Sequence, residues 1–144
     1  MSYEVFGQLV LAALLGVLIG TERRLSHKTA GMRTFALVSL GSALFTIISS
    51  MFVSDPARIA SQVVVGIGFL GAGMIVLRGG STLGLTTAAG LWTAAGIGMA
   101  VGLRLYALAI FATLLAIVIF LVLWWIEERF VGAVLAEKSS DERQ

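Results

Sequence analysis

Five long apolar runs dominate the sequence, and the charged residues lie near their ends, between them or beyond them. A helix needs about 20 apolar residues to cross a bilayer. Only 12% of the residues are charged, against about 25% in soluble domains. The sequence therefore predicts an all-α membrane protein. We expect residues 1–126 to form a compact bundle of five transmembrane helices, followed by a short polar tail at 127–144. The expected helices span about 3–20, 34–53, 56–77, 83–103 and 105–126.

The distribution of basic residues predicts an orientation. If the loop between the first two helices is cytoplasmic, only Arg58 and Arg104 of the ten Lys and Arg residues remain on the other side. Cytoplasmic loops are enriched in Lys and Arg. We therefore expect the N-terminus outside and the C-terminus in the cytoplasm, as in a multi-pass protein. We expect Arg24 and Lys28 to set the orientation of the protein in the membrane and to have no further role.

Small residues recur at four-residue spacing in several runs, which favours close helix packing. The third run carries small residues on two faces, so we expect it to be central in the bundle. The fifth run has no glycine, so we expect a peripheral helix. The expected packing residues are Gly16, Gly20, Gly66, Gly68, Gly71, Gly73, Gly90, Gly98 and Gly102.

The second run separates into a hydroxyl face and an aliphatic face at helical spacing. We expect the first to point into the bundle and the second toward lipid. The hydroxyl face comprises Ser39, Ser42, Ala43, Thr46, Ser49 and Ser50, and the aliphatic face Leu37, Leu40, Leu44, Ile47, Ile48 and Met51.

Several function classes are disfavoured. The run Gly66–Gly71 matches the dinucleotide pattern G-x-G-x-x-G, but it lies inside an apolar span instead of after a strand. Basic residues at the ends of apolar runs indicate membrane orientation, so we expect no nucleic-acid partner. The chain has no cysteine, one histidine and no acid deep within a run. We therefore expect no enzyme activity, no metal site and no cofactor.

Two candidate sites remain. The first is a cytoplasmic interaction site formed by Glu22, Arg23, Arg33 and Arg78. Within it, Glu22 and Arg33 either pair across the first loop or are two separate solvated charges. The second is an intramembrane polar site, which comprises Asp55, Arg58, Gln62, Thr86, Thr87 and Trp92. Asp55 is also the expected N-cap of the helix that begins at Pro56.

Three ordered blocks resemble the MgtC/SapB family of bacterial inner-membrane proteins. The first is Glu22-Arg23 followed by residues 30–34 (AGMRT). The second is residues 55–64 (DPARIASQVV), which continue into 66–73 (GIGFLGAG). The third is residues 84–89 (GLTTAA) with Leu91-Trp92 and 95–98 (AGIG). The resemblance as a whole covers roughly residues 5 to 125.

The resemblance implies a five-helix protein of the bacterial inner membrane, linked to magnesium-limited growth and, in pathogens, to virulence. It also implies an accessory role in ion and membrane-energy homeostasis, with a membrane protein partner such as the ATP synthase. Longer members carry a C-terminal cytoplasmic domain, and we expect a short form without it.

Three functional hypotheses follow. The first is an accessory or regulatory protein that acts through helix–helix contacts, as a homodimer or small homo-oligomer in the bilayer. The second is a small oligomeric transporter or channel for magnesium or another cation. The third is a binder of lipid or of an anionic metabolite at Arg23, Arg33 and Arg78.

Overall fold

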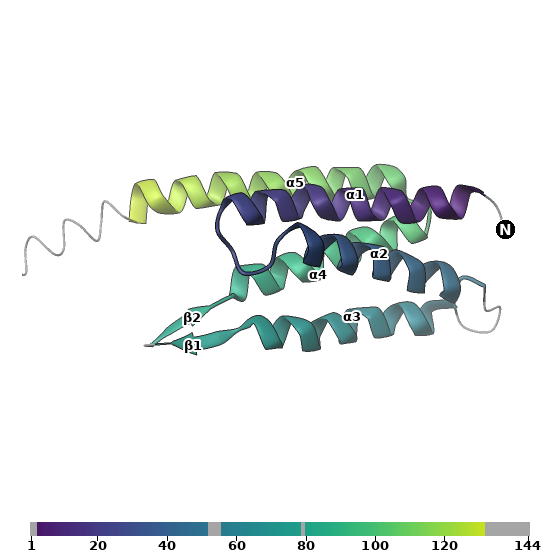
Figure 1. Ribbon diagram of the computed structural model, residues 1–144, viewed down its shortest axis with the longest axis horizontal. Helices are drawn as coiled ribbons and strands as arrows, with labels where there is room; N and C mark the ends of the chain where they lie inside the picture. Colours follow the sequence, from purple (N-terminus) through teal and green to yellow (C-terminus); the bar gives the residue numbers. More distant parts are fainter. Residues whose placement is uncertain (1–2, 52–55, 79, 132–144) are drawn as a thin grey trace, which may run out of the picture.

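The computed structural model describes residues 3–51, 56–78 and 80–131 and consists mainly of five helices (Figure 1). These are α1 (Tyr3–Leu25), α2 (Met32–Ser49), α3 (Pro56–Met74), α4 (Leu85–Gly102) and α5 (Tyr106–Ile126). A two-stranded antiparallel hairpin, β1 (Val76–Arg78) and β2 (Ser81–Leu83), connects α3 to α4. A π-helical turn, Glu127–Val131, continues α5.

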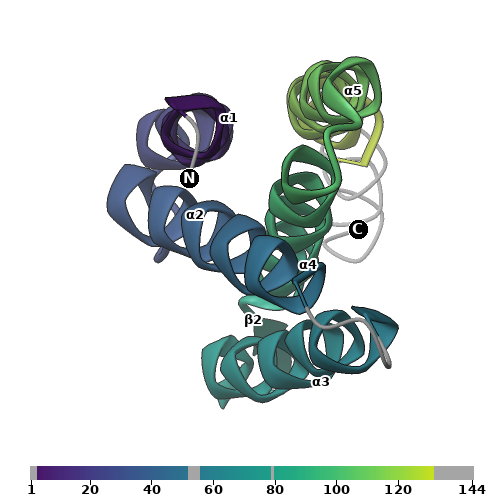
Figure 2. The same ribbon diagram turned by 90° about the vertical axis from the view of Figure 1, so that its right-hand side faces the viewer.

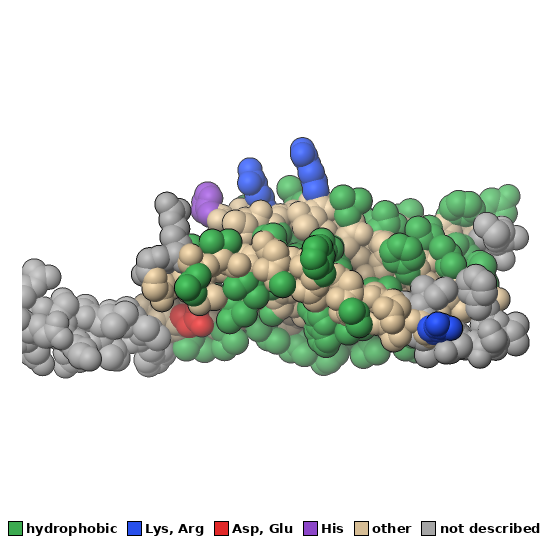
Figure 3. Space-filling view, turned by 90° about the horizontal axis from the view of Figure 1, so that it is seen from below, with side chains coloured by type: hydrophobic (Ala, Val, Ile, Leu, Met, Phe, Trp, Pro, Cys, Tyr) green, Lys and Arg blue, Asp and Glu red, His purple; other side chains and the backbone are tan. Residues whose placement is uncertain are grey.

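The predicted all-helical bundle is confirmed, and four of the helices are long and apolar enough to span a membrane: α1, α2, α4 and α5, the last extended to Arg129. The apolar part of α3, Ser61–Met74, is shorter. Hydrophobic side chains cover much of the surface seen in Figure 3. Crossing by α3 and the orientation of the bundle stay predictions.

The connections gather at two ends of the bundle (Figure 1). The α1–α2 loop, the hairpin and the C-terminal end of α5 lie at one end, which we call the loop end. The N-terminus and the α4–α5 turn lie at the opposite end. Each end therefore contains the segments that the charge distribution assigned to one side of the membrane.

Helix α4 is the central helix, in contact with all four others, and Figure 2 shows it between α2, α3 and α5. Its glycines permit this position. A Cβ on Gly98 would collide with the carbonyl oxygen of Ser39, and one on Gly102 would lie 2.8 Å from the Cβ of Thr46. On α1, a Cβ on Gly16 would lie 2.8 Å from the Cα of Ala36. Backbone contact at these positions joins α1, α2 and α4.

The predicted packing glycines fall into two groups. Gly16, Gly20, Gly90, Gly98 and Gly102 are buried with tight neighbours, and Gly71 lies at ordinary contact distance from Ala88. At Gly66, Gly68 and Gly73, an added Cβ would meet nothing within 4 Å. The prediction that the third helix is central is therefore wrong. Glycine spacing indicates where a backbone can approach closely, but it does not specify a neighbour within the same chain.

The predicted faces of α2 are largely confirmed. Ser39, Ser42, Ala43, Thr46 and Ser49 are buried, whereas Ser50 is exposed. Ile47 is buried, against expectation, because it lies at the border of the face that packs on the bundle. The Thr46 hydroxyl donates to the Ser42 carbonyl at 2.8 Å, so its hydrogen bond stays within α2. Most large side chains of α5 are exposed, which confirms a peripheral helix.

The helix boundaries differ most at charged segments. Helix α1 continues to Leu25 instead of ending near residue 20, since charged side chains do not interrupt backbone hydrogen bonds. Helix α3 ends at Met74 instead of 77, and the expected break at 78–82 is part of a hairpin. Gly84 begins α4 at φ 88° beside the Met74 carbonyl, a conformation that favours glycine.

Candidate functional site

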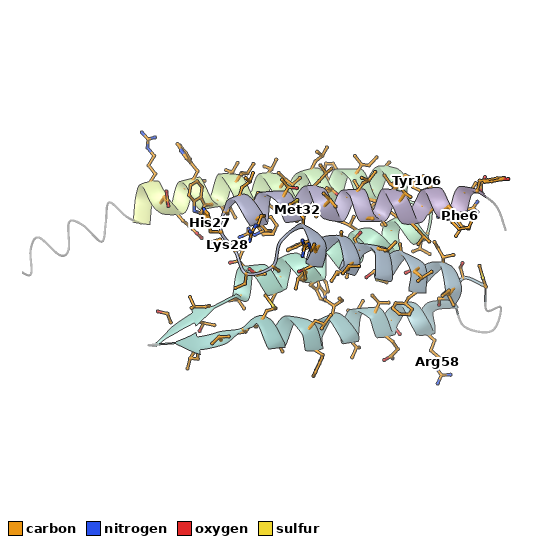
Figure 4. All side chains as sticks on the ribbon, viewed as in Figure 1. Phe6, His27, Lys28, Met32, Arg58 and Tyr106 are labelled. Atoms are coloured by element: carbon orange, nitrogen blue, oxygen red, sulfur yellow. The ribbon has the colours of Figure 1, made fainter. Side chains whose placement is uncertain are left out.

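The C-terminal end of α1 turns back on itself and brings two basic residues together. The Lys28 amide donates to the Arg23 carbonyl at 3.0 Å, and the His27 amide donates to the Arg24 carbonyl at 3.2 Å. His27 lies in the left-handed region at φ 53°. These features define a Schellman motif, in which the chain reverses over the last helical turn. The motif holds the backbone of Lys28 next to that of Arg23, and Lys28 lies at the loop end (Figure 4).

A buried ion pair lies beneath this turn. Arg23 Nη1 is 3.3 Å from Glu22 Oε2, and their side chains are 3% and 9% exposed. The Ser26 hydroxyl donates to Glu22 Oε1 at 2.8 Å. The guanidinium also stacks over the Phe120 ring of α5, 4.2 Å from its centroid. The side chains of Glu22 and Arg23 therefore link the end of α1 to α5.

The hydrogen bonding of this pair is incomplete. Glu22 Oε2 and Arg23 Nε have no hydrogen-bond partner among the described residues, although the two groups are in ion-pair contact. A guanidinium carries five N–H donors, and buried polar groups without partners cost free energy. Arg23 also lines a groove between α4 and α5 together with Lys28. Within the described residues, the site therefore leaves the Arg23 Nε–H without an acceptor, and Arg23 lines the edge of a largely apolar groove.

The structure divides the predicted cytoplasmic site. Glu22 pairs with Arg23, so the pairing of Glu22 with Arg33 is not formed. Arg33 is exposed and lines a different groove, between α2 and α3. The side chain of Arg78, on β1, lies outside the described part of the structure. Lys28, which we expected to serve only in topology, lines the Arg23 groove. The chain reversal after α1 decides this grouping, and it depends on backbone geometry at His27.

The structure does not bring the described residues of the predicted intramembrane polar site together. Arg58 lies at the end of the bundle opposite the loop end (Figure 4). Gln62 lines the α2–α3 groove, whereas Thr86 lines the α4–α5 groove. Thr87 is buried and Trp92 is 56% exposed. Asp55 lies outside the described residues, so its capping role stays a prediction. The described residues of this set therefore occupy separate faces of α3 and α4.

Two polar contacts at the N-terminal end were missed from the sequence. Glu4 and Arg104 form an exposed ion pair, with Oε2 and Nη2 3.2 Å apart. Gln8 is buried, and its Nε2 donates to the carbonyl of Val101 at 2.9 Å. Gln8 is a lone polar residue inside the first apolar run. Because such residues in membrane helices usually form hydrogen bonds to a neighbouring helix, the sequence could have predicted this contact.

Gln8→Leu is expected to lower the free energy of unfolding by about 1–2 kcal/mol, because the bond between α1 and α4 is lost. The measurement is unfolding in mixed micelles with increasing dodecyl sulfate. Gln62→Leu is the matched control, since Gln62 is exposed. Equal stability of the two variants would contradict the structural role of Gln8.

The described residues contain no group of three or more His, Asp or Glu side chains that could hold a metal ion. Hard divalent cations prefer several oxygen ligands, usually with carboxylates among them. The buried carboxylate of Glu22 is already paired with a cation. In chemical terms, the loop-end site therefore suits an anionic group better than a metal ion.

Comparison with known proteins decides the family. A model described as the MgtC family matches residues 9–129. The chain belongs to the MgtC family. The match includes α2, α3, α4 and α5 and all but the first turns of α1. No solved structure matches the chain.

Curated relatives of this MgtC-family chain are similar over most of its length. It is 42% identical over 129 residues to the putative magnesium transporter YhiD of Escherichia coli, covering 83% of this chain and 60% of YhiD. It is 50% identical over 109 residues to protein MgtC of Salmonella typhimurium, covering 74% and 47%. Protein MgtC of Brucella abortus is 46% identical over 110 residues, covering 75% and 46%. The chain thus spans about half to three-fifths of the length of these relatives.

The three blocks that resembled the MgtC family now have positions in the fold. The first forms the end of α1, the reversing loop and the start of α2, and therefore includes the Glu22–Arg23 pair. The second runs along α3, and the third begins α4 beside the groove that Arg23 lines. The first and third blocks meet at the loop end.

Proposed function

We propose that this protein is a multi-pass protein of the bacterial inner membrane that serves as an accessory or regulatory factor in magnesium homeostasis. Membership of the MgtC family supports this proposal. So does the similarity to YhiD, a putative magnesium transporter. We infer that the protein acts by contact with other membrane helices and has no enzyme activity.

The charged side chains at the loop end favour an accessory role over ion conduction. Glu22 is the only acidic side chain buried within the described residues, and Arg23 neutralises it. Charged paths through membranes usually present ionisable groups to a water-filled cavity. The polar side chains of α2, α3 and α4 that could line a path for ions are also dispersed: Ser39 and Thr46 are fully buried, whereas Gln62 and Thr86 line different grooves.

The outer face of α3 supports self-association. The small residues Ser61, Gly68 and Ala72 share one helical face with Val65, and all four are exposed. Figure 2 shows α3 at the edge of the bundle. Small residues on one face let two membrane helices approach closely. We therefore propose a homodimer in which this face of α3 packs against its copy. Another membrane protein, such as the ATP synthase, is the alternative partner for the same face.

Cysteine crosslinking tests the proposed contact, since the chain has no cysteine of its own. Gly68→Cys should give a disulfide-linked dimer in native membranes, whereas Val118→Cys, on the exposed face of α5, should not. In a variant with Ala72→Cys as the crosslinking reporter, adding Gly68→Leu should abolish the crosslink. The protomer should stay folded, because a Cβ added at Gly68 meets nothing within 4 Å. Recovery of only monomers and no partner would reject the helix-contact proposal.

A flux assay separates the accessory role from transport. We expect purified protein in liposomes to give no magnesium influx above that of empty vesicles. The growth of a deletion strain in low magnesium should nevertheless be impaired and be restored by the wild-type chain. Magnesium influx that depends on the protein would contradict the accessory role and favour the transporter hypothesis.

A further inference from the structure

The groove between α4 and α5 has a volume of about 490 Å³ and begins beside Arg23. Its polar end contains Arg23, Lys28, Thr86 and Glu127. Thr86 belongs to the first turn of α4, where a helix favours negative charge. Arg23 and Lys28 are the cationic side chains of this lining and Glu127 is its acidic one, and Arg23 is also paired with Glu22. Lys28 and the Arg23 Nε–H, which has no acceptor within the described residues, are therefore the donors that the polar end offers to an anion.

Arg23 provides a second, independent indication of a ligand. Its side chain is 3% exposed, and its guanidinium is paired with the Glu22 carboxylate and stacked on the Phe120 ring. Within the described residues, its Nε–H has no hydrogen-bond acceptor. A phosphate oxygen in the groove would supply acceptors to this guanidinium, which suits phosphate because its donors form a planar fork.

The rest of the groove is apolar and follows the helices toward the middle of the bundle. Its walls there include Ala89 and Thr93 of α4 and Ala112, Leu115 and Ile119 of α5. Leu115 and Ile119 are also exposed on the surface of α5. The Thr93 hydroxyl donates to the Ala89 carbonyl at 3.0 Å, so it adds no free donor to this wall. A long apolar group could therefore lie along the groove in contact with the bilayer.

We propose that this groove binds an anionic phospholipid, with its phosphate at Arg23 and Lys28 and an acyl chain along Ala89, Ala112 and Leu115. The combination of a cationic end and an apolar channel favours a lipid over a free phosphate, which would leave the channel unfilled. Basic pockets between membrane helices on the cytoplasmic side are known to hold such head groups. This site is independent of the accessory role, because it requires neither magnesium nor a protein partner.

The test measures lipid binding to the purified full chain in a non-ionic detergent. Native mass spectrometry counts bound lipids, and thermal unfolding reports the affinity during titration with phosphatidylglycerol. We expect one saturable phosphatidylglycerol site that raises the melting temperature. Phosphatidylcholine and inorganic phosphate at the same concentrations should bind much more weakly. Saturable binding of inorganic phosphate alone would overturn the lipid assignment.

Variants locate the site. Lys28→Gln should weaken phosphatidylglycerol binding about tenfold, the effect of losing one charge-assisted hydrogen bond. Arg24→Gln is the matched control. Arg24 carries the same charge and lies four residues before Lys28, but its side chain does not line the groove. Ala89→Phe, at an exposed wall position, should block the acyl chain and weaken binding by a similar factor.

The Lys28→Gln and Ala89→Phe variants test the site even if substitutions at Arg23 prevent folding. Neither Lys28 nor Ala89 is buried, so both variants should fold. Equal loss of affinity in Lys28→Gln and Arg24→Gln would show general surface attraction and overturn the site. Unchanged affinity in Ala89→Phe would overturn the placement of the acyl chain. Failure of the flux or crosslinking assays would leave this binding result unaffected.

Discussion

Gly98→Ala is expected to lower the free energy of unfolding by about 2–3 kcal/mol, and Gly98→Leu to prevent formation of the bundle. The added Cβ would collide with the carbonyl oxygen of Ser39, and that atom belongs to the backbone of α2. A flexible side chain could move aside, but here α2 and α4 must separate. Because α4 is central, this separation would affect most contacts in the bundle.

Gly96 provides the matched control two residues along the same helix. A Cβ at Gly96 meets nothing within 4 Å, so Gly96→Ala should change the stability by less than about 0.5 kcal/mol. The comparison is made by unfolding in mixed micelles and by size-exclusion profiles in detergent. If Gly96→Ala and Gly98→Ala are equally stable, the close approach of α2 and α4 is wrong.

Glu22→Gln is expected to destabilise the folded protein by about 3–5 kcal/mol, because it leaves the Arg23 charge buried without its partner. Arg23 is 3% exposed, and the carboxylate of Glu22 is its only anionic contact within the described residues. The measurement is again the free energy of unfolding in mixed micelles. The position of Arg23 over Phe120 should change as well, which links this pair to the shape of the α4–α5 groove.

Glu4→Gln is the control, since it removes an equivalent charge from the Glu4–Arg104 pair. Both side chains of that pair are more than 60% exposed, and exposed pairs contribute about 0–1 kcal/mol. A double variant, Glu22→Leu with Arg23→Leu, should recover much of the stability lost in Glu22→Gln, because no unpaired charge remains. Equal losses in Glu4→Gln and Glu22→Gln would contradict burial of the loop-end pair.

The packing core and the loop-end site depend on each other. Gly16 and Gly20 let α2 approach α1 at backbone distance, and a Cβ on Gly20 would lie 2.8 Å from the Met32 nitrogen. This close approach holds the start of α2 against the end of α1, next to the Glu22–Arg23 pair. Substitutions at Gly20 should therefore disturb both the bundle and the groove, whereas Lys28→Gln should affect only the groove.

The sequence by itself determined the helical membrane architecture, the family and the faces of individual helices. Apolar runs of sufficient length have few alternatives in a bilayer, because every backbone polar group must be paired internally. The buried hydroxyls of α2 and the packed glycines of α1 and α4 followed from the 3.6-residue period alone. These features depend on local geometry, so a sequence pattern is enough to predict them.

Only the tertiary structure decided which residues share a site. Arg23 and Arg33 are ten positions apart, yet they line different grooves, whereas Lys28 joins Arg23 through the chain reversal at His27. The glycines of α3 resemble those of α4, but only α4 is enclosed by the other helices. Periodicity defines the face of a helix, whereas the neighbour of that face is set by how all five helices pack together.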